Sequence, residues 1–533
     1  MIRLRQVKIL VEQDSENTRK QKVSKLLRCK MEDIQKVMIR KQSIDARHKD
    51  QIFFVYELDV EVDQESKILK KNHSKDIFPT PDEHYHLPKR GTKKLLYRPV
   101  VVGSGPAGLF AAYLLAEMGY QPIIIERGEK MAERKKTVES FWQTGKLNPE
   151  SNVQFGEGGA GTFSDGKLNT LTKDKEGRGR KVFETFVKHG APSDILYLQK
   201  PHIGTDLLSQ VIVRMREEII SMGGEFRYQT CLTDLIIEDG KLVAIECNHD
   251  ETFPCTHLIL AIGHSARDTF EMLYHHNLEM HAKPFAIGVR VEHPQTLINH
   301  VQYGPKYESL LPPADYKLTY TTTKGRGVYS FCMCPGGFVV NASSEEGHLA
   351  INGMSNHDRG EKNANSALVV TLNTKDFGDQ PLDGMHYQQT LEHLAYERGQ
   401  GKIPVQLYKD FQKNRASTSF GEVEPIFKGH YHFDNLKEWM PREITEALEE
   451  ALPVFGRKMP GFDQEDMIMA GIESRTSSPV RILRNEHMES SILGIYPCGE
   501  GAGYAGGITT AAIDGLKVAE SLIEDYDVPE TLS

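Results

Sequence analysis

The first 62 residues show a pattern of hydrophobic and polar positions that predicts three strands and one helix. Residues 2–11, 34–44 and 52–62 alternate with the two-residue period of half-buried strands. Residues 17–29 instead place their apolar side chains on one face of a helix. The order of these elements, βαββ, predicts a small ferredoxin-like α+β module.

A polar stretch separates this module from a region with a different pattern. Residues 63–95 show no periodicity and contain three prolines, so we predict a linker. Residues 97–102 form a short apolar run, and two later runs, residues 258–262 and 493–496, have a similar composition. Short apolar runs bounded by glycine are typical of buried parallel strands, and they predict an α/β fold.

The stretch between the last two runs differs from both, because it is rich in Tyr and His and its strand patterns are broken. We therefore predict an α+β domain inserted into the α/β domain. The predicted boundaries are residues 1–95 for the module and linker, 96–283 for the first part of the α/β domain, 284–480 for the inserted substrate or cap domain, and 481–533 for the C-terminal part of the α/β domain.

A glycine motif lies between the first apolar run and a helical segment. It consists of Gly103, Ser104, Gly105, Pro106, Ala107 and Gly108. In such a GxGxxG motif the glycines permit a tight turn, close approach of a pyrophosphate and close packing of helix on strand. Glu126, followed by Arg127, ends the next strand, where an acid binds the adenosine ribose. Its charge disfavours a 2′-phosphate, so FAD or NAD fits and NADP does not.

The C-terminal segment distinguishes FAD from NAD. Residues 494–508 run from a strand into a glycine loop with one acid, and residues 509–523 continue as a helix. This segment resembles the second FAD fingerprint of the glutathione-reductase-like flavoproteins. The resemblance implies that the acid holds the ribityl or pyrophosphate region and that the helix N-terminus faces the flavin, where its dipole favours the reduced form. The candidate contacts are Gly499, Glu500, Gly507 and Ile508.

Two further segments are similar to the same superfamily. Residues 256–263 resemble its motif of a threonine, an apolar run and a glycine. Residues 155–167 resemble a glycine-rich loop that runs beside the isoalloxazine in related flavoproteins, and an ordinary surface turn is the alternative for them. The candidate FAD contacts from these segments and from the chain between them are Gly158, Gly159, Gly161, Thr162, Ser164, Leu232, Ala261 and Gly263.

The chain is similar over nearly its whole length to a family of bacterial proteins described as uncharacterised FAD-dependent dehydrogenases. The similar stretches are residues 103–108, 156–167, 283–293, 332–337, 352–355, 475–481 and 499–507. The resemblance implies a Rossmann-type FAD-binding domain with an inserted α+β domain. It also implies an FAD-dependent oxidoreductase that transfers a hydride to or from flavin N5, and it names no substrate.

Candidates for catalysis are cationic or nucleophilic residues near the two crossings between the domains. Arg475 is the first candidate and Arg290 the second, because each could hold an anionic substrate or the reduced flavin; structural salt bridges are the alternative. His264 directly follows the strand that ends near residue 262 and is the third. Cys332 and Cys334 form a Cys-x-Cys pair that we interpret as buried strand residues rather than a redox pair. No spacing of Cys and His predicts a metal site.

Composition narrows the classes of partner. The net charge of -9 argues against nucleic acid, although residues 1–50 carry 14 Lys and Arg against 7 Asp and Glu, a local charge of +7. That basic end is either a docking surface or the solvated face of a small domain. No apolar run reaches the ~20 residues of a membrane span, and no apolar segment follows Met1 as in a signal peptide. Seven cysteines without paired spacing fit a reducing compartment, so we expect a cytoplasmic protein.

We therefore expect a small-molecule substrate and no membrane or nucleic-acid partner. No second GxGxxG motif follows a strand, so the electron donor is either NAD(P)H that binds transiently or another molecule. Two alternative functions stay open. One is a flavin-dependent enzyme that modifies tRNA or another RNA, and the other is a non-catalytic FAD-binding sensor or scaffold.

Overall fold

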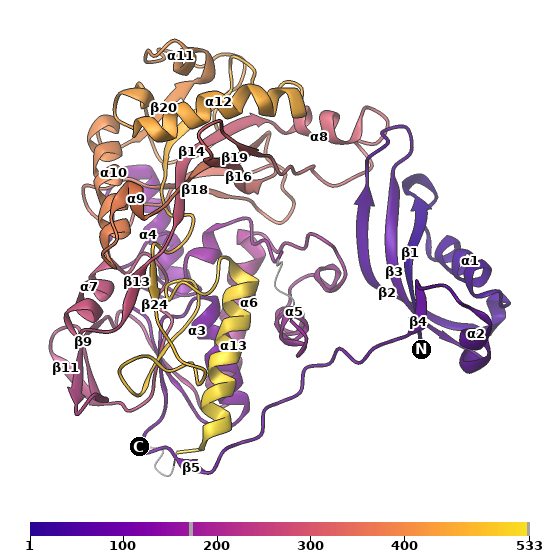
Figure 1. The fold of residues 1–533 in the computed structure, drawn as a ribbon, viewed down its shortest axis with the longest axis horizontal. Coiled ribbons are helices and arrows are strands. Elements are labelled where there is room, and N and C mark those ends of the chain that lie inside the picture. Colours follow the sequence, from indigo (N-terminus) through magenta and orange to yellow (C-terminus); the bar gives the residue numbers. More distant parts are fainter. Residues whose placement is uncertain (170–173, 530–533) are drawn as a thin grey trace.

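The computed structural model of this chain describes residues 1–169 and 174–529, and it has three parts (Figure 1). A small N-terminal module stands to one side of a domain built on a parallel sheet, and a third domain sits above the parallel sheet. The mixed α/β architecture that the sequence pattern predicts is confirmed.

The N-terminal module is a four-stranded antiparallel sheet with two helices. Its elements are β1 (Ile2–Leu10), α1 (Glu16–Leu27), β2 (Ile34–Asp45), β3 (Phe53–Val62), α2 (Glu65–Lys71) and β4 (Ile77–Pro79). The strand order β2-β3-β1-β4 is that of a ferredoxin-like fold, as predicted. Residues 65–79 were predicted as part of a linker, and this prediction is wrong. They supply α2 and the edge strand β4, elements too short to produce a clear periodicity.

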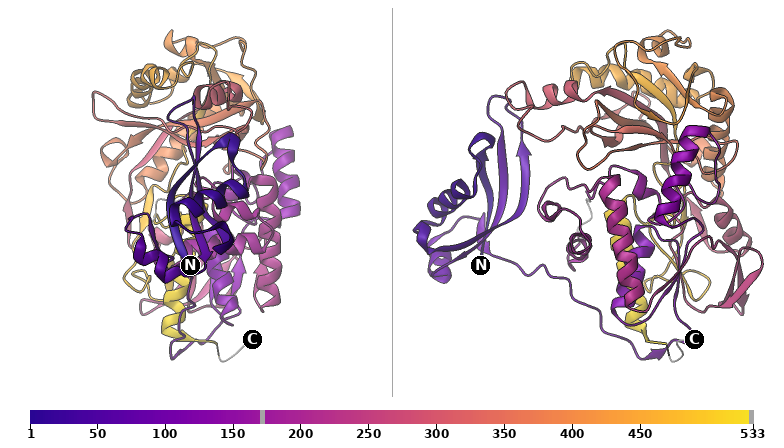
Figure 2. Two further views of the ribbon diagram at one scale, coloured as in Figure 1. Left: turned by 90° about the vertical axis from the view of Figure 1, so that its right-hand side faces the viewer. Right: turned by 180° about the vertical axis from the view of Figure 1, so that it is seen from behind.

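The module touches the rest of the chain at one end and through the segment that follows it (Figure 2). Ile52, just before β3, is fully buried in the core of the third domain. The backbone carbonyl of Gln42 on β2 accepts a hydrogen bond of 2.8 Å from the N–H of Gln199. The following segment is pinned to the parallel-sheet domain, because the Tyr85 hydroxyl donates to Glu520 at 2.8 Å. It ends in β5 (Lys93–Lys94), which pairs with β26 (Tyr526–Asp527).

The central domain has a five-stranded parallel sheet in the order β25-β12-β6-β7-β8. These strands are β6 (Val100–Val102), β7 (Ile123–Ile125), β8 (Glu225–Arg227), β12 (Leu258–Leu260) and β25 (Ile495–Pro497). Helices α3 (Pro106–Glu117), α6 (Thr205–Ser221) and α13 (Ile508–Asp525) pack on one face. Helix α3 is apolar almost throughout because it is buried between the sheet and α13.

The opposite face of this sheet is covered by a meander of three antiparallel strands and by helix α7. The elements are β9 (Leu232–Glu238), β10 (Lys241–Cys247), β11 (Glu251–Pro254) and α7 (Arg267–His275). Alternate residues of the short strands point to the two faces, so Val101 belongs to the core under α3, whereas Val100 and Val102 belong to the core under the meander. The remaining helices of the domain are α4 (Met131–Thr144) and α5 (Arg178–Lys188).

The third domain is inserted between β12 and β25, as the sequence pattern predicts. The chain crosses into it and back along a pair of antiparallel strands, β13 (Met280–Ala282) and β24 (Val480–Ile482). Its main sheet has seven strands in the order β15-β16-β19-β14-β23-β20-β22, and a smaller sheet has the order β18-β17-β21. The strands are β14 (Phe285–Pro294), β15 (Thr319–Thr321), β16 (Gly327–Cys334), β17 (Phe338–Asn341), β18 (Ile351–Met354), β19 (Asn363–Leu372), β20 (Ile403–Leu407), β21 (Phe427–Lys428), β22 (Tyr431–Phe433) and β23 (Ile468–Glu473).

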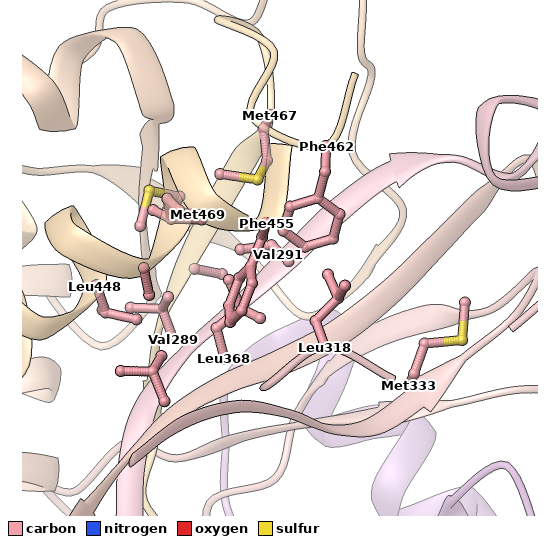
Figure 3. Close-up of a cluster of buried hydrophobic side chains, with 14 of the residues drawn as sticks. Val289, Val291, Leu318, Met333, Leu368, Leu448, Phe455, Phe462, Met467 and Met469 are labelled. Carbon is pink, nitrogen blue, oxygen red and sulfur yellow. The ribbon is translucent and has the colours of Figure 1, made fainter. Parts of the chain in front are cut away.

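The core of the inserted domain lies between its main sheet and helix α12 (Figure 3). Val289 and Val291 of β14 and Leu368 of β19 pack against Leu448 and Phe455 of α12. The helices of this domain are α8 (Gln295–Tyr303), α9 (Thr374–Phe377), α10 (Asp383–Gly399), α11 (Tyr408–Gln412) and α12 (Arg442–Lys458). Among the helices that the structure describes, none is at once long and apolar enough to cross a bilayer.

One carboxyl group in this domain is buried without a counter-charge. Glu292 on β14 is 1% exposed, and its Oε1 accepts hydrogen bonds from the side chain of Asn363 (3.3 Å) and from the N–H of Ile426 (3.0 Å). Its Oε2 has no hydrogen-bond partner within the described part of the chain. Burial raises the pKa of Glu292 to about 7.

Replacing Glu292 with glutamine should therefore change how stability depends on pH. Between the unfolded pKa of about 4.3 and the folded value the unfolded chain loses its proton first, so stability falls as pH rises through this window, by up to about 3 kcal/mol. Glutamine has no proton to lose. The free energy of unfolding should be measured with denaturant at about pH 5 and about pH 8. Relative to the wild type, Glu292→Gln should be more stable at the higher pH than at the lower pH, whereas the exposed Glu422→Gln should show no such change. Parallel pH profiles for wild type and Glu292→Gln would contradict this assignment.

Candidate functional site

A cavity of about 510 Å³ lies at the carboxyl ends of β6, β7, β12 and β25. Ligands of open α/β sheets bind at this edge. The inserted domain closes the other side with residues 315–317, 330–334, 350–353, 473, 475 and 476. The cavity is therefore shared by the two domains, and a molecule bound on the parallel sheet would face the inserted domain.

The glycine motif at the start of α3 is shaped by close backbone contacts. Gly103 has a φ of +96°, in the left-handed region that favours glycine. A Cβ on Gly108 would lie 1.9 Å from the carbonyl oxygen of Gly103, so helix and turn approach as closely as they do only without a side chain. Gly105 lies against Gly159 of the glycine-rich loop, since a Cβ on Gly159 would lie 2.9 Å from the Cα of Gly105.

The carboxylate of Glu126 joins three loops at this edge. Its Oε2 accepts from the N–H (3.0 Å) and the hydroxyl (2.7 Å) of Ser104, and its Oε1 accepts from the N–H groups of Gly128 and Gly156, both at 3.0 Å. A carboxylate has about four acceptor sites, so protein donors already use them. Glu126 lines the cavity, and its main structural role is to hold the loops that form the cavity wall.

The glycine-rich loop is organised by Arg134, a residue that the sequence patterns did not single out. Arg134 on α4 is fully buried, and its guanidinium donates to five carbonyl groups between residues 152 and 159 at 2.7–3.2 Å. Burial lowers the pKa of Arg134 to about 10, so it stays protonated at neutral pH. No local sequence motif marks Arg134, because it stands in an ordinary amphipathic helix.

Most of the predicted cofactor contacts line the cavity. These are Gly103, Gly105, Pro106, Ala107, Glu126, Arg127, Gly159, Gly161, Ser164, Leu232, Ala261, Gly263, Glu500, Gly507 and Ile508. The predicted contacts that do not line it are Ser104, Gly108, Gly158, Thr162 and Gly499. They support the wall from behind: the Ser104 hydroxyl is turned to Glu126, and a Cβ on Gly499 would lie 2.6 Å from that of Ala107.

Three glycines give the cavity room for a ligand. A Cβ built on Gly263, Gly506 or Gly507 would meet no atom within 4 Å, and all three residues line the cavity. Gly507 caps the N-terminus of α13, an 18-residue helix whose free N–H groups favour a negatively charged group. The residues present therefore fit a dinucleotide such as FAD.

His264 lines the cavity beside this helix start and has one free ring nitrogen. Its Nδ1 lies 3.0 Å from Oε1 of Glu500, and its side chain is 10% exposed. Its Nε2 is buried and has no hydrogen-bond partner among the described residues. If Nδ1 donates to Glu500, Nε2 is left as an acceptor for a bound molecule.

Arg475 also lines the cavity, but its guanidinium is engaged. It donates to Glu392 at 3.0 and 2.7 Å, to the Ser265 hydroxyl at 3.1 Å and to the Ser344 hydroxyl at 2.5 Å. Glu392 on α10 is fully buried and also binds Arg267 of the central domain at 2.8 and 2.9 Å. Burial acts to raise the pKa of Glu392, but the two guanidinium groups outweigh it and hold that pKa well below its usual range.

Arg290 was predicted as a cavity cation, and this prediction is wrong. Its side chain is fully buried and does not line the cavity. It makes a two-pronged ion pair with Glu473 at 2.8 and 2.9 Å and donates to Asn365 at 2.8 Å and to the carbonyl of Cys332 at 3.1 Å. The fifth N–H donates to Asn352 at 3.3 Å. A buried cation needs such partners, and they leave no N–H of Arg290 free for a substrate.

The Cys-x-Cys pair lies on the cavity wall, which the strand pattern did not predict. β16 has a bulge between Phe331 and Cys334, and Cys332 adopts a left-handed φ of +41° there. Cys334 is buried as predicted, but Cys332 is exposed to the cavity, so the prediction of a buried pair is wrong for Cys332. Partial removal from water between the two domains still raises the pKa of Cys332 to about 12, so its thiol is protonated at neutral pH. Protonated thiols are poor nucleophiles, which argues against a disulfide-type redox pair. Among the described residues no group of three or more His, Cys, Asp or Glu could hold a metal ion.

The sequence patterns missed most of the cavity wall that the inserted domain supplies. Lys167, Met333, Asn352 and Thr476 lie within stretches that resemble the family, but the resemblance assigned them no role. The wall residues outside all such stretches include Tyr316, Lys317, Phe331 and Ile351, together with Asn169, Lys200 and Thr230 of the central domain. They come from strands and loops that are distant in sequence, and no local motif marks them.

Comparison with known proteins gives matches along much of the chain. A family profile described as "FAD-dependent protein, C-terminal domain-like" matches residues 284–476, and a profile described as "NAD(P)-binding Rossmann-like domain" matches residues 101–140. A domain of unknown function matches residues 1–61. A protein of Clostridium beijerinckii, named "Uncharacterized protein", is 51% identical over 535 residues, which cover 99% of this chain and 100% of that protein.

Two solved structures illustrate the distant similarity. Glycine oxidase from Bacillus cereus is 12% identical, with 80% of this chain and 94% of that chain covered and a TM-score of 0.34. The quinol fumarate reductase subunit FrdA of E. coli is 9% identical, with 81% and 70% covered and a TM-score of 0.37.

Replacing Glu126 with alanine should weaken FAD binding. The change removes a buried charge that holds the Ser104, Gly128 and Gly156 loops, and hydrogen bonds to a charged group contribute about 1.5–3 kcal/mol. Titration of the apo-protein with FAD should give a dissociation constant raised roughly ten-fold or more. The exposed Glu133→Ala on α4 is the control and should bind FAD like the wild type. An unchanged constant for Glu126→Ala would show that these loops do not form the binding site.

Proposed function

Since the chain belongs to a family of FAD-dependent proteins, we propose that it is an oxidoreductase that transfers a hydride between a small organic substrate and flavin N5. The observation that carries the proposal is the shared cavity, which has a dinucleotide cradle on one side and polar and apolar side chains of the inserted domain on the other. A protein that only stores or senses FAD has no need of a second, chemically mixed wall.

The order of the sheet supports an assignment of residues to parts of the cofactor. Glu126 follows β7 and Thr230 follows β8. The loops that Glu126 holds, together with Thr230, would form the site of the adenosine ribose, and Gly105 at the start of α3 would accommodate the pyrophosphate. Glu500 lies in the loop after β25 and Gly507 caps α13, and both would hold the flavin side. Bound FAD would supply the group that accepts or donates the hydride.

His264 is the residue that best fits a role in proton transfer. Oxidation of an alcohol or amine removes a hydride and a proton from the substrate, and a base must take the proton. Glu500 can fix the ring of His264 through Nδ1, and Nε2 can then accept the proton. Arg475 is a positioning residue in this proposal, because its N–H groups are bonded to Glu392 and to two serines.

The proposal predicts that the purified protein carries FAD that acid precipitation releases. Anaerobic mixing with small alcohols, amines and acids, or with NAD(P)H, should bleach the oxidised flavin for at least one compound. If no compound reduces the flavin, the result favours the alternative of a non-catalytic FAD-binding sensor or scaffold. If RNA binds instead, with an affinity that falls steeply with salt and requires residues 1–90, the RNA-modifying alternative replaces the proposal.

Replacing His264 with glutamine should slow reduction of the flavin by that compound by roughly 10²-fold or more, the usual contribution of a general base. FAD content should remain that of the wild type. The exposed His281→Gln serves as the control. Stopped-flow measurement of flavin bleaching tests this, and wild-type rates in His264→Gln would remove His264 from the mechanism.

A further inference from the structure

The acidic groups that line the cavity all have partners. Asp165 is bound by Arg359 at 2.9 and 2.5 Å, and Asp315 is bound by Lys200 at 2.6 Å. The remaining acids, Glu126, Glu473 and Glu500, are bound by N–H groups, by Arg290 and by His264, respectively. Four of these carboxylates are therefore neutralised by a cation or held by several N–H groups, and Glu500 has one side-chain partner, His264.

Two lysines of the cavity wall have positive charges that no close carboxylate neutralises within the described part of the chain. Lys317 is exposed and makes no ion pair or hydrogen bond within the described part of the chain. The ammonium of Lys167 lies 3.8 Å from Asp165, beyond hydrogen-bond length, and Arg359 already binds both oxygens of that carboxylate. The Lys167 side chain is 25% exposed.

Both lysines lie at the same end of the cavity, beside β16. Lys317 precedes β15, whose Thr319 pairs with Tyr329 of β16, so Lys317 stands near Phe331. Lys167 lies near the end of the same strand, because Arg359, which binds the neighbouring Asp165, packs its backbone against Gly336 just after β16. Lys167 is also close to the start of α13, because the Thr509 hydroxyl donates to the carbonyl of Leu168 at 2.8 Å.

This end of the cavity lies beside the start of α13, which is itself next to the start of α3, because Gly161 packs against both Pro106 and Ile508. The glycine motif and the N-terminus of α3 follow β6, and Glu126 follows β7, whereas α13 follows β25 on the other side of β12. The two lysines therefore lie toward the α13 side of the cavity, away from the Glu126 end of the sheet. They are well placed to act on a second molecule between α13 and the inserted domain.

The wall next to the lysines is apolar and partly aromatic. Phe331, Met333 and Ile351 line the cavity there. Phe331 also packs on a small apolar cluster with Ala286 and Ala367, which is separate from the core under α12. We propose that the substrate is an organic anion whose charged group binds Lys167 and Lys317 and whose apolar body lies against β16. This inference rests on the proposed function, since it places the substrate beside the flavin.

The test measures ligand binding to the FAD-loaded protein. Binding is monitored through changes in the flavin absorbance, under conditions without turnover. Benzoate, phenyl phosphate, a short-chain fatty acid and the uncharged benzamide are the probes. At least one of the anions should bind more tightly than benzamide, and its affinity should fall with salt because exposed charges are screened. Tighter binding of benzoate or of phenyl phosphate then identifies a carboxylate or a phosphate as the preferred group.

Lys167→Gln and Lys317→Gln should each weaken binding of the preferred anion by roughly two- to five-fold, as expected for partly exposed ion pairs, and the double variant by roughly ten-fold. Benzamide binding should not change. Lys362→Gln, at an exposed lysine paired with Glu424 outside the cavity, is the matched control. Equal affinity for benzoate and benzamide in the wild type, absence of any bound anion, or wild-type affinity in the double variant would overturn the inference. Anion binding by a protein whose flavin no substrate reduces would instead overturn the proposed oxidoreductase activity and leave this site in place.

Discussion

The shape of the cavity depends on one buried carboxylate, that of Glu392. It lies between Arg267 of the central domain and Arg475 of the inserted domain, and it also accepts from the Ser474 hydroxyl at 2.5 Å. Transfer of one carboxylate and two guanidinium groups from water is costly, and only complete pairing offsets that cost. Any shift of one domain against the other would break these pairs, so the two walls of the cavity keep a fixed separation.

The loops that form the cavity wall on the central domain are held by two buried charged side chains of opposite sign. Arg134 is a buried cation surrounded by backbone carbonyls, and Glu126 is a buried anion surrounded by backbone N–H groups. Both act on the loop around Gly156, which gives its carbonyl to Arg134 and its N–H to Glu126. A glycine-rich loop is inherently flexible, and these two charges restrict it to one conformation. The glycines thus permit the close approach of loops, while the two charged side chains select it.

The sequence predicted those features that depend on neighbours along the chain. The GxGxxG turn, the apolar strands of the parallel sheet and the order of β1, α1, β2 and β3 are local patterns, and each is present. The partners of Arg475 could not be predicted, because Glu392 lies 83 residues away and Ser265 lies 210 residues away. An arginine in a sequence looks the same whether it binds substrate or a buried acid, and only the fold supplies the distinction. The short elements α2 and β4 were missed because seven and three residues carry too little periodicity.

Arg290 shows how a residue outside the cavity can still determine its wall. The bulge in β16 turns residues 331–334 toward the cavity, and bulges re-aim side chains in this way next to functional sites. A left-handed φ at Cys332 is unfavourable for a residue with a Cβ, so the surrounding structure must hold it. Arg290 does so, because it donates to the Cys332 carbonyl while Glu473 and Asn365 fix its guanidinium. The cation that the sequence suggested as a substrate ligand therefore acts through the backbone, and it places Phe331 and Met333 where an apolar group of the substrate would lie.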